Sequence, residues 1–285
     1  MKKLYLVLAA LLLVAGCKKK NDTLVPVRIF VNDFTITQDT LPSKDGIPEY
    51  NGVKAVTLAF YKADGSEQYK VTQFRADAST YTTFGDFSLS LPMGSYTMVV
   101  LGYGLNDGEP AITLTSPTEA TFGTYPARET FVATQAVNIT NTNAVELSAT
   151  LNRVVSKLKV HSTDGCTENA VSVRVTISAG GKAFNPTTGL ATANTGFINT
   201  LPIISTVGQN TNSSTYLFLA TDEQTVTVTI DVLDALEASI SHKVVENVPL
   251  QRNRQTTLSG SLYNGDATTD FEINTTWLSE LEVPF

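Results

Sequence analysis

Apolar and polar residues alternate with a period of two along most of the chain. The clearest examples are residues 171–177 and 226–232, each of which places four apolar side chains on one face and polar side chains on the other. This alternation is typical of antiparallel strands with one buried face. Turn signals separate further strand-like runs at residues 25–31, 53–61, 69–74, 84–91, 95–103, 111–115, 129–134, 136–139, 144–149, 154–161, 216–220, 238–244, 256–262 and 271–277. Since no stretch has the periodicity of a three-turn amphipathic helix, the pattern predicts an all-β protein.

So many strands exceed the seven or so that make one immunoglobulin-sized sandwich. Residues 138–145 are polar and rich in asparagine and threonine, which makes them a natural seam. The sequence therefore predicts two tandem β-sandwich domains, residues 25–143 and residues 144–285. Residues 179–212 are rich in Gly, Asn, Thr and Pro and long for a loop. We expect an exposed excursion with a short strand or two, either a binding loop or a surface loop without a partner.

The N-terminus has the pattern of an export signal. Two lysines precede an apolar run of 13 residues, 4–16, which would span roughly 20 Å as a helix and so fall short of a bilayer core of about 30 Å. Residues 1–16 are therefore predicted to be a signal peptide. The run ends in Leu13-Val14-Ala15-Gly16-Cys17, which resembles a bacterial lipobox. The alternative is a signal anchor with an incidental cysteine.

The lipobox predicts cleavage between Gly16 and Cys17, with lipid attached to the Cys17 thiol. Residues 17–24 would then be a lipidated tether, and the acylated Cys17 would hold the protein in outer-membrane lipid. Cys166 is the only other cysteine, so no disulfide is expected within the mature chain. It lies in a turn-like stretch without a basic neighbour, and we expect an unreactive turn residue.

Composition and charge narrow the function. The chain has 16% charged residues and about 40 threonines, which favours sheet. Its formal net charge of −7 argues against a nucleic-acid partner. The only histidines, His161 and His242, lie within strand patterns, and no motif of a hydrolase, a phosphate-binding loop or a paired-cysteine metal site occurs. We therefore expect a protein that is not an enzyme, with no catalytic residues, no cofactor and no metal site.

Two groups of acidic residues are candidates for chemistry. Asp231, Asp234 and Glu237 lie near a strand end and are expected to form a solvated turn rather than a glycosidase pair. Asp266 and Asp270 are expected in a hairpin turn rather than a calcium loop, because the spacing of known calcium loops is missing.

Four stretches, taken in order, resemble a known family. They are Phe87-Ser-Leu-Ser-Leu-Pro-Met-Gly-Ser-Tyr96 with the strand that follows, Leu151-Asn-Arg-Val-Val-Ser-Lys-Leu-Lys-Val160, Leu250-Gln-Arg-Asn-Arg-Gln-Thr-Thr-Leu-Ser-Gly-Ser-Leu-Tyr263, and the last strand ending in Trp277. Together with the lipobox they resemble the fimbrillin-like family of Bacteroidales, the lipoprotein subunits and anchors of type V pili.

The resemblance implies a fold, a location and a partner. The fold would be two tandem transthyretin-like Greek-key β-sandwiches, with the protein lipid-anchored at the cell outer membrane and part of a fimbrium. The function would be pilus assembly or cell adhesion, and the partners other fimbrial subunits that bind by strand addition. Pro92 and Gly94, the latter with a positive φ, would turn the chain. The Tyr96 hydroxyl would face water, and the Trp277 ring would be buried.

The sequence departs from a polymerising subunit of that family. There, the resemblance implies, proteolysis after an arginine removes the lipidated first strand and opens a groove for a neighbour's strand. Here the only early arginine is Arg28, inside the apolar strand at residues 25–31, and the next is Arg75. Residues 278–285 form a short tail for a donor strand. We therefore expect an anchor or accessory subunit that keeps its lipid.

The alternative function is a surface lipoprotein that binds glycan or host protein through exposed loops such as residues 179–212, whose aromatic residues are Phe184 and Phe197. Two short segments, Asp22-Thr23-Leu24 and Asp39-Thr40-Leu41, also resemble a Bacteroidales O-glycosylation signal at Thr23 and Thr40.

Overall fold

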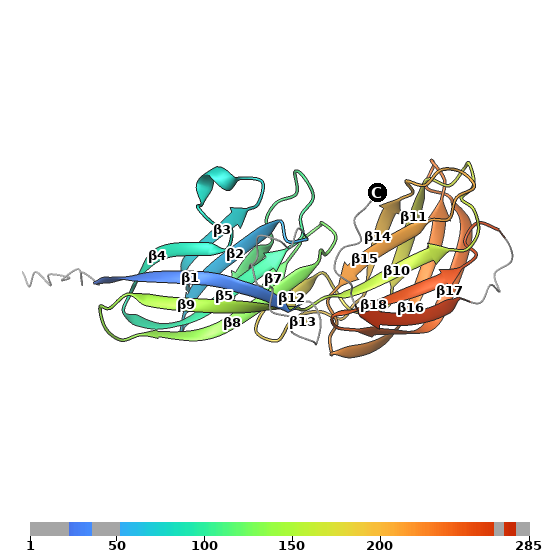
Figure 1. Ribbon diagram of the computed structural model, residues 1–285. Helices are drawn as coiled ribbons and strands as arrows, with labels where there is room; N and C mark the ends of the chain where they lie inside the picture. Colours follow the sequence, from blue (N-terminus) through green and yellow to red (C-terminus); the bar gives the residue numbers. More distant parts are fainter. Residues whose placement is uncertain (1–22, 36–51, 265–270, 278–285) are drawn as a thin grey trace, which may run out of the picture.

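The computed structural model describes residues 23–35, 52–264 and 271–277 (Figure 1). Within these ranges nearly every element is a strand, and the one helical element is the single 3-10 turn Ala78–Thr80. The predicted all-β class is therefore confirmed. Figure 1 shows two β-sheet lobes side by side, the N-terminal lobe in blue and green and the C-terminal lobe in yellow to red.

The N-terminal lobe is built on one seven-stranded sheet. In spatial order its strands are β3 (Glu67–Phe74), β2 (Ala55–Lys62), β5 (Gly94–Tyr103), β8 (Thr130–Ile139), β9 (Val145–Arg153), β1 (Leu24–Thr35) and β4 (Asp86–Pro92). β8 and β9 pair through only two residue pairs, Phe131 with Arg153 and Val132 with Asn152. At this corner the sheet folds over, so that β3-β2-β5-β8 and β9-β1-β4 become the two layers of a sandwich.

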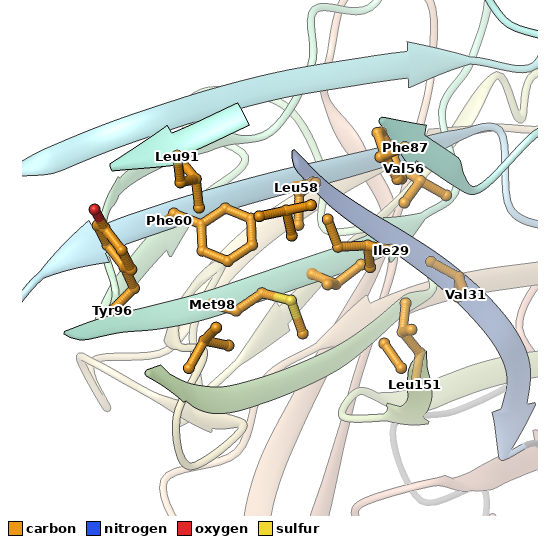
Figure 2. Packing of buried hydrophobic residues seen from close by; sticks show 14 of the residues in the cluster. Ile29, Val31, Val56, Leu58, Phe60, Phe87, Leu91, Tyr96, Met98 and Leu151 are labelled. Atoms are coloured by element: carbon orange, nitrogen blue, oxygen red, sulfur yellow. The ribbon is translucent and has the colours of Figure 1, made fainter. Parts of the chain in front are cut away.

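Alternating side chains from both layers fill the space between them. Ile29 and Val31 of β1 point toward Val56, Leu58 and Met98 of the opposite layer (Figure 2). Each of these side chains is buried. The period-two pattern that predicted the strands is therefore the pattern that fills this core.

The C-terminal lobe consists of two four-stranded sheets with a second core between them. One sheet has the order β15 (Asn212–Leu217), β10 (Ser156–Ser162), β18 (Arg254–Gly260) and β19 (Glu272–Trp277). The other has the order β14 (Phe197–Pro202), β11 (Ser172–Ile177), β16 (Glu223–Leu233) and β17 (Ser239–Gln251). The strongly alternating runs lie in β11 and β16, where Val173, Val175, Val228 and Ile230 are buried.

A fourth, small sheet joins the two lobes. Its order is β13 (Leu190–Ala191), β12 (Ala183–Asn185), β7 (Glu119–Thr121) and β6 (Thr113–Ser116). β12 and β13 come from the stretch expected to be an exposed excursion, yet β12 pairs with β7 of the N-terminal half. The expected short strands are present, but this part of the stretch is a joint between the lobes rather than a free loop.

The boundary between the two lobes lies further along the chain than predicted, after residue 153 rather than between residues 143 and 144. β9 pairs with β1 in parallel and with β8 at the sheet corner, so residues 145–153 belong to the N-terminal sheet. The predicted seam was wrong because its polar residues form only the turn between β8 and β9. The chain crosses to the second lobe after Arg153.

The turn between β4 and β5 also differs from its prediction. Gly94 begins β5 without a positive φ. A Cβ on Gly94 would lie 3.2 Å from the Tyr96 hydroxyl, so close approach of the Tyr96 ring explains the glycine. The hydroxyl donates a hydrogen bond to the Pro92 carbonyl at 2.8 Å rather than facing water. β19 carries Trp277 at its end, but that side chain lies outside the described part of the structure.

Candidate functional site

The first strand is the feature on which the predicted function depends. β1 lies inside the sheet, antiparallel to β4 on one side and parallel to β9 on the other. The ladder with β4 runs from Leu24 opposite Pro92 to Phe30 opposite Asp86. The ladder with β9 begins at Val27, so from Val27 to Phe30 both edges of β1 are hydrogen-bonded and neither is free.

The inward face of β1 is apolar and buried from Val25 to Val31. Val25, Val27, Ile29 and Val31 are at most 7% exposed, and Figure 2 shows Ile29 and Val31 among the side chains of the cluster. Burying four such side chains stabilises the fold by roughly 6–12 kcal/mol. This is comparable to the whole stability of a typical domain, about 5–15 kcal/mol. β1 is therefore an integral strand, and a lobe without it would need a replacement strand of similar apolar character.

Arg28 lies on the outward face of the same strand. Its guanidinium donates to both carboxylate oxygens of Asp86 on β4, with Nε–Oδ1 3.2 Å and Nη2–Oδ2 2.6 Å. It also lies over the Phe30 ring, 4.2 Å from the centroid. The hydrogen bonds with Asp86 raise the pKa of Arg28. The Arg28 side chain is thus accessible, while its backbone is held in the two ladders, as the sequence predicted for an arginine within a strand.

The predicted processing and lipid-attachment residues, Gly16 and Cys17, lie outside the described residues, as does Thr40. Thr23 is described and exposed, one residue before β1 begins. Cys166 is a free cysteine, as expected from its lack of a partner, but it is buried rather than a surface turn residue. Its backbone amide donates to the Gln209 carbonyl at 2.8 Å.

The two histidines lie in strands, as predicted, but one belongs to a polar cluster that sequence reasoning missed. Asp231 accepts hydrogen bonds from Arg174 and contacts Nδ1 of His242 at 2.7 Å. These residues come from β16, β11 and β17 and meet on the outer face of their sheet. Burial alone would raise the pKa of Asp231, but hydrogen bonds from His242 and Arg174 outweigh it and lower the pKa. Strand register, which the sequence pattern does not give, brings the three together.

The turn that the sequence predicted for Asp231, Asp234 and Glu237 begins only at Asp234. Its carboxylate accepts from the backbone amides of Leu236 and Ala238 at 2.8 and 2.9 Å. Asp231, in contrast, belongs to the strand and not to the turn. Asp266 and Asp270 lie outside the described residues.

The joint between the lobes is the second feature that the sequence did not predict. Phe184 of β12 is fully buried and stacks on Phe218, with ring centroids 4.2 Å apart. Phe122, which follows β7, also stacks on Phe218, with ring centroids 6.4 Å apart. Nearby, the buried Arg153 side chain pairs with Glu129 at 2.7 Å and donates to Asn253 Oδ1 at 3.1 Å. Phe184 is therefore core, which removes it as a platform for an exposed ligand.

The described residues contain neither a metal-binding cluster nor a membrane-spanning helix. No group of three or more histidine, cysteine or acidic side chains there is placed to hold a metal ion. Nor does any helix in the described ranges have the length and apolar character to cross a bilayer.

The fold is similar to solved structures of surface proteins from Bacteroidales. A candidate adhesin from Bacteroides ovatus has a TM-score of 0.55 at 12% identity, covering 91% of this chain and 97% of that chain. The fimbrial anchor protein Mfa2 from Porphyromonas gingivalis has a TM-score of 0.51 at 13% identity, covering 91% and 100%. A second B. ovatus candidate adhesin has a TM-score of 0.51 at 13% identity, covering 82% and 87%.

These structures confirm the resemblance to fimbrillin-like proteins at the level of the fold, and they are described as adhesins and a fimbrial anchor protein. No curated protein sequence matches the chain. A model of a family of unknown function, DUF6562, matches residues 53–284, and the chain therefore belongs to this family.

Proposed function

We propose that the protein is a lipid-anchored structural subunit of surface fimbriae that acts as an anchor or accessory subunit and not as an enzyme. The observation that carries the proposal is the position of β1. The strand follows directly after the tether predicted to begin at acylated Cys17. Both of its edges are paired from Val27 to Phe30, and its inward side chains from Val25 to Val31 are buried. A subunit that keeps this strand keeps its lipid, and it stays at the membrane while other subunits assemble on it.

Other fimbrial subunits would bind by strand addition at β19 rather than by replacing β1. β19 supports this, because within the described part of the chain it pairs only with β18, and its residues from Glu272 to Thr276 are exposed. A strand held mainly by main-chain hydrogen bonds on one side can be extended at its free edge or exchanged for another strand. β1, in contrast, is held on both edges and by buried side chains.

Fatty-acid labelling tests the anchor. Cells expressing the wild-type chain or Cys17→Ala are fed a clickable palmitate analogue, and the protein is followed in outer-membrane and soluble fractions. Labelled wild type in the membrane and unlabelled, released Cys17→Ala are expected. Cys166→Ala is the matched control and should label like wild type. Equal labelling of wild type and Cys17→Ala would contradict the proposal.

Limited proteolysis tests retention of β1. Trypsin added to the folded chain is expected to yield no early fragment beginning at Ile29, because the ladders on both sides keep the strand out of an extended protease cleft. Asp86→Ala should behave in the same way, since the ladders rather than the ion pair protect the bond. Prompt cleavage after Arg28 in the native protein would favour a shaft subunit.

A further inference from the structure

The N-terminal sandwich is closed on one side and open on the other. On the closed side the sheet continues from β8 to β9, whereas β3 and β4 are the two ends of the strand order. A cavity of about 520 Å³ lies between these ends, lined from β1, β3, β4 and the segment between β3 and β4. Its size lies within the range of small-molecule sites, about 300–1,000 Å³.

A single side chain ties together the two strands that border this groove. Gln73 of β3 donates from Nε2 to the Asp86 carbonyl at 2.8 Å and accepts from the Gly85 amide at 2.7 Å. Like a backbone peptide group in a sheet, the Gln73 side-chain amide both donates and accepts a hydrogen bond, and it links β3 to the start of β4. The contact fixes the width of the groove and occupies the position where an added strand would begin to pair with β4.

The groove wall combines an aromatic surface with uncommitted hydroxyl groups. Tyr69 projects from β3 with its ring packed against the core, yet its hydroxyl makes no hydrogen bond within the described part of the chain. Thr82, Thr83 and Ser88 also line the groove, and their side-chain hydroxyls are exposed and make no hydrogen bond to the described residues. Hydroxyls of this kind can donate and accept, and a tyrosine presents an apolar ring beside a polar tip.

The charges in the groove are balanced. Arg28 and Asp86, the charged residues of its lining, form the two-point ion pair already described. A charged ligand would have to break this pair to find a partner. An apolar ligand would leave the hydroxyls of the wall without water or any other hydrogen-bond partner.

We propose that this β3–β4 groove binds a neutral oligosaccharide. A sugar ring has an apolar C–H face that suits the Tyr69 ring, and a rim of hydroxyls that suits the threonine and serine hydroxyls. Neither partner needs a net charge. The site does not depend on how the chain is anchored, and it lies apart from the segment 179–212, where Phe184 is buried and unavailable.

The test uses the full-length chain in a detergent without a sugar headgroup, such as lauryldimethylamine oxide. Saturation-transfer NMR is recorded with cellotetraose, xylotetraose, maltotetraose and chitotetraose, and with the acidic 3′-sialyllactose for comparison. We expect binding of at least one neutral oligosaccharide and a weaker signal or none from sialyllactose.

Two pairs of variants locate the binding. Tyr69→Phe keeps the ring and its packing and should weaken the affinity about fivefold, as expected for one hydrogen bond; Tyr125→Phe, at an exposed tyrosine outside the groove, should change nothing. Ser88→Gln fills the groove and should weaken binding at least about tenfold. Ser90→Gln is its control, because Ser90 is exposed on the same strand but does not line the groove.

Three results would overturn the proposal. They are the absence of binding by every neutral oligosaccharide in the panel, equal losses for each variant and its control, and binding of a synthetic peptide with the sequence of residues 24–35 where no sugar binds. The last result would make the groove a strand-accepting site. Circular dichroism of each variant confirms that it is folded before binding is compared.

Discussion

Phe184 stacks on Phe218 with ring planes 14° apart, and this contact lies where the small joining sheet meets the core shared by the two lobes. β12, which carries Phe184, pairs with β7 of the N-terminal half. The lobes therefore share both backbone hydrogen bonds and a buried aromatic cluster. We therefore expect the two sandwiches to unfold together as one unit.

Removing the ring should uncouple the lobes. Phe184→Ala is expected to destabilise the protein by about 3–5 kcal/mol through the cavity it leaves. Urea unfolding followed by far-UV circular dichroism and by Trp277 fluorescence should coincide for the wild type and separate for the variant. Ile204→Ala is the control, since Ile204 is 85% exposed. Coincident transitions for Phe184→Ala would show that the joint does not couple the lobes.

A second prediction concerns how much the buried side chains of β1 contribute to the free energy of unfolding. Ile29 is fully buried, so Ile29→Ala should lower the free energy of unfolding by about 2–5 kcal/mol. Leu24→Ala on the same strand should change it by less than about 0.5 kcal/mol, because Leu24 is 60% exposed. Urea denaturation measures both. A loss below about 1 kcal/mol for Ile29→Ala would mean that β1 is dispensable and contradict its assignment as an integral strand.

The turn between β4 and β5 leads to a third prediction, which concerns the hydrogen bond of Tyr96. Tyr96→Phe removes the hydrogen bond to the Pro92 carbonyl and should cost about 0.5–1.5 kcal/mol. Gly94→Ala should also destabilise the protein, because the added methyl would push on the Tyr96 ring. Tyr125→Phe removes an exposed hydroxyl and serves as the reference in the same denaturation series. Equal stabilities of Tyr96→Phe and Tyr125→Phe would show that the turn does not depend on this bond.

The surroundings of Asp164 predict how the free energy of unfolding changes as the pH falls. Burial would raise the pKa of its carboxyl, but hydrogen bonds from the Ser261 hydroxyl and the amides of Leu262, Tyr263 and Asn264 outweigh it, so the pKa is lowered. A lowered pKa means that the folded state holds this proton less tightly than the unfolded chain does. Asp164 therefore contributes stability above its ordinary, unfolded pKa of about 3.9, and the contribution is lost as the pH falls through the lower folded value.

Urea midpoints between pH 6 and pH 2.5 measure this dependence. Asp164→Asn should lower the midpoint at pH 6 and reduce its fall toward acid, whereas Asp107→Asn, at an exposed residue, should leave the profile close to that of the wild type. Profiles of the same slope for the wild type and Asp164→Asn would refute the linkage.

Strict alternation made the long strands predictable. The predicted run 226–232 lies within β16, and the predicted run 171–177 matches β11 except that it starts one residue earlier. Alternation within a run indicates one buried face, and this can be recognised without knowing which strands pair with it. Two predicted runs, 129–134 and 136–139, form the single strand β8. The short strand β7 was missed, and β12 was expected only as an unplaced short strand within residues 179–212. Each is three residues long and is stabilised by pairing with a segment distant in sequence.

The candidate sites were predictable only in part. Arg28 was correctly placed within a strand, because that inference needs only the local pattern. The groove between β3 and β4 depends on where the two ends of a folded sheet meet, and Tyr69, Gln73 and Ser88 have no spacing that signals this. The cluster of Arg174, Asp231 and His242 depends in the same way on the register of three strands.

The central claim is that the mature subunit keeps β1 and its lipid. The most direct test is the intact mass of the chain recovered with fimbriae from outer membranes, with its N-terminal peptide sequenced. The account predicts a chain that begins at acylated Cys17 and includes Arg28. A chain that begins at Ile29 and carries no acyl group would contradict it.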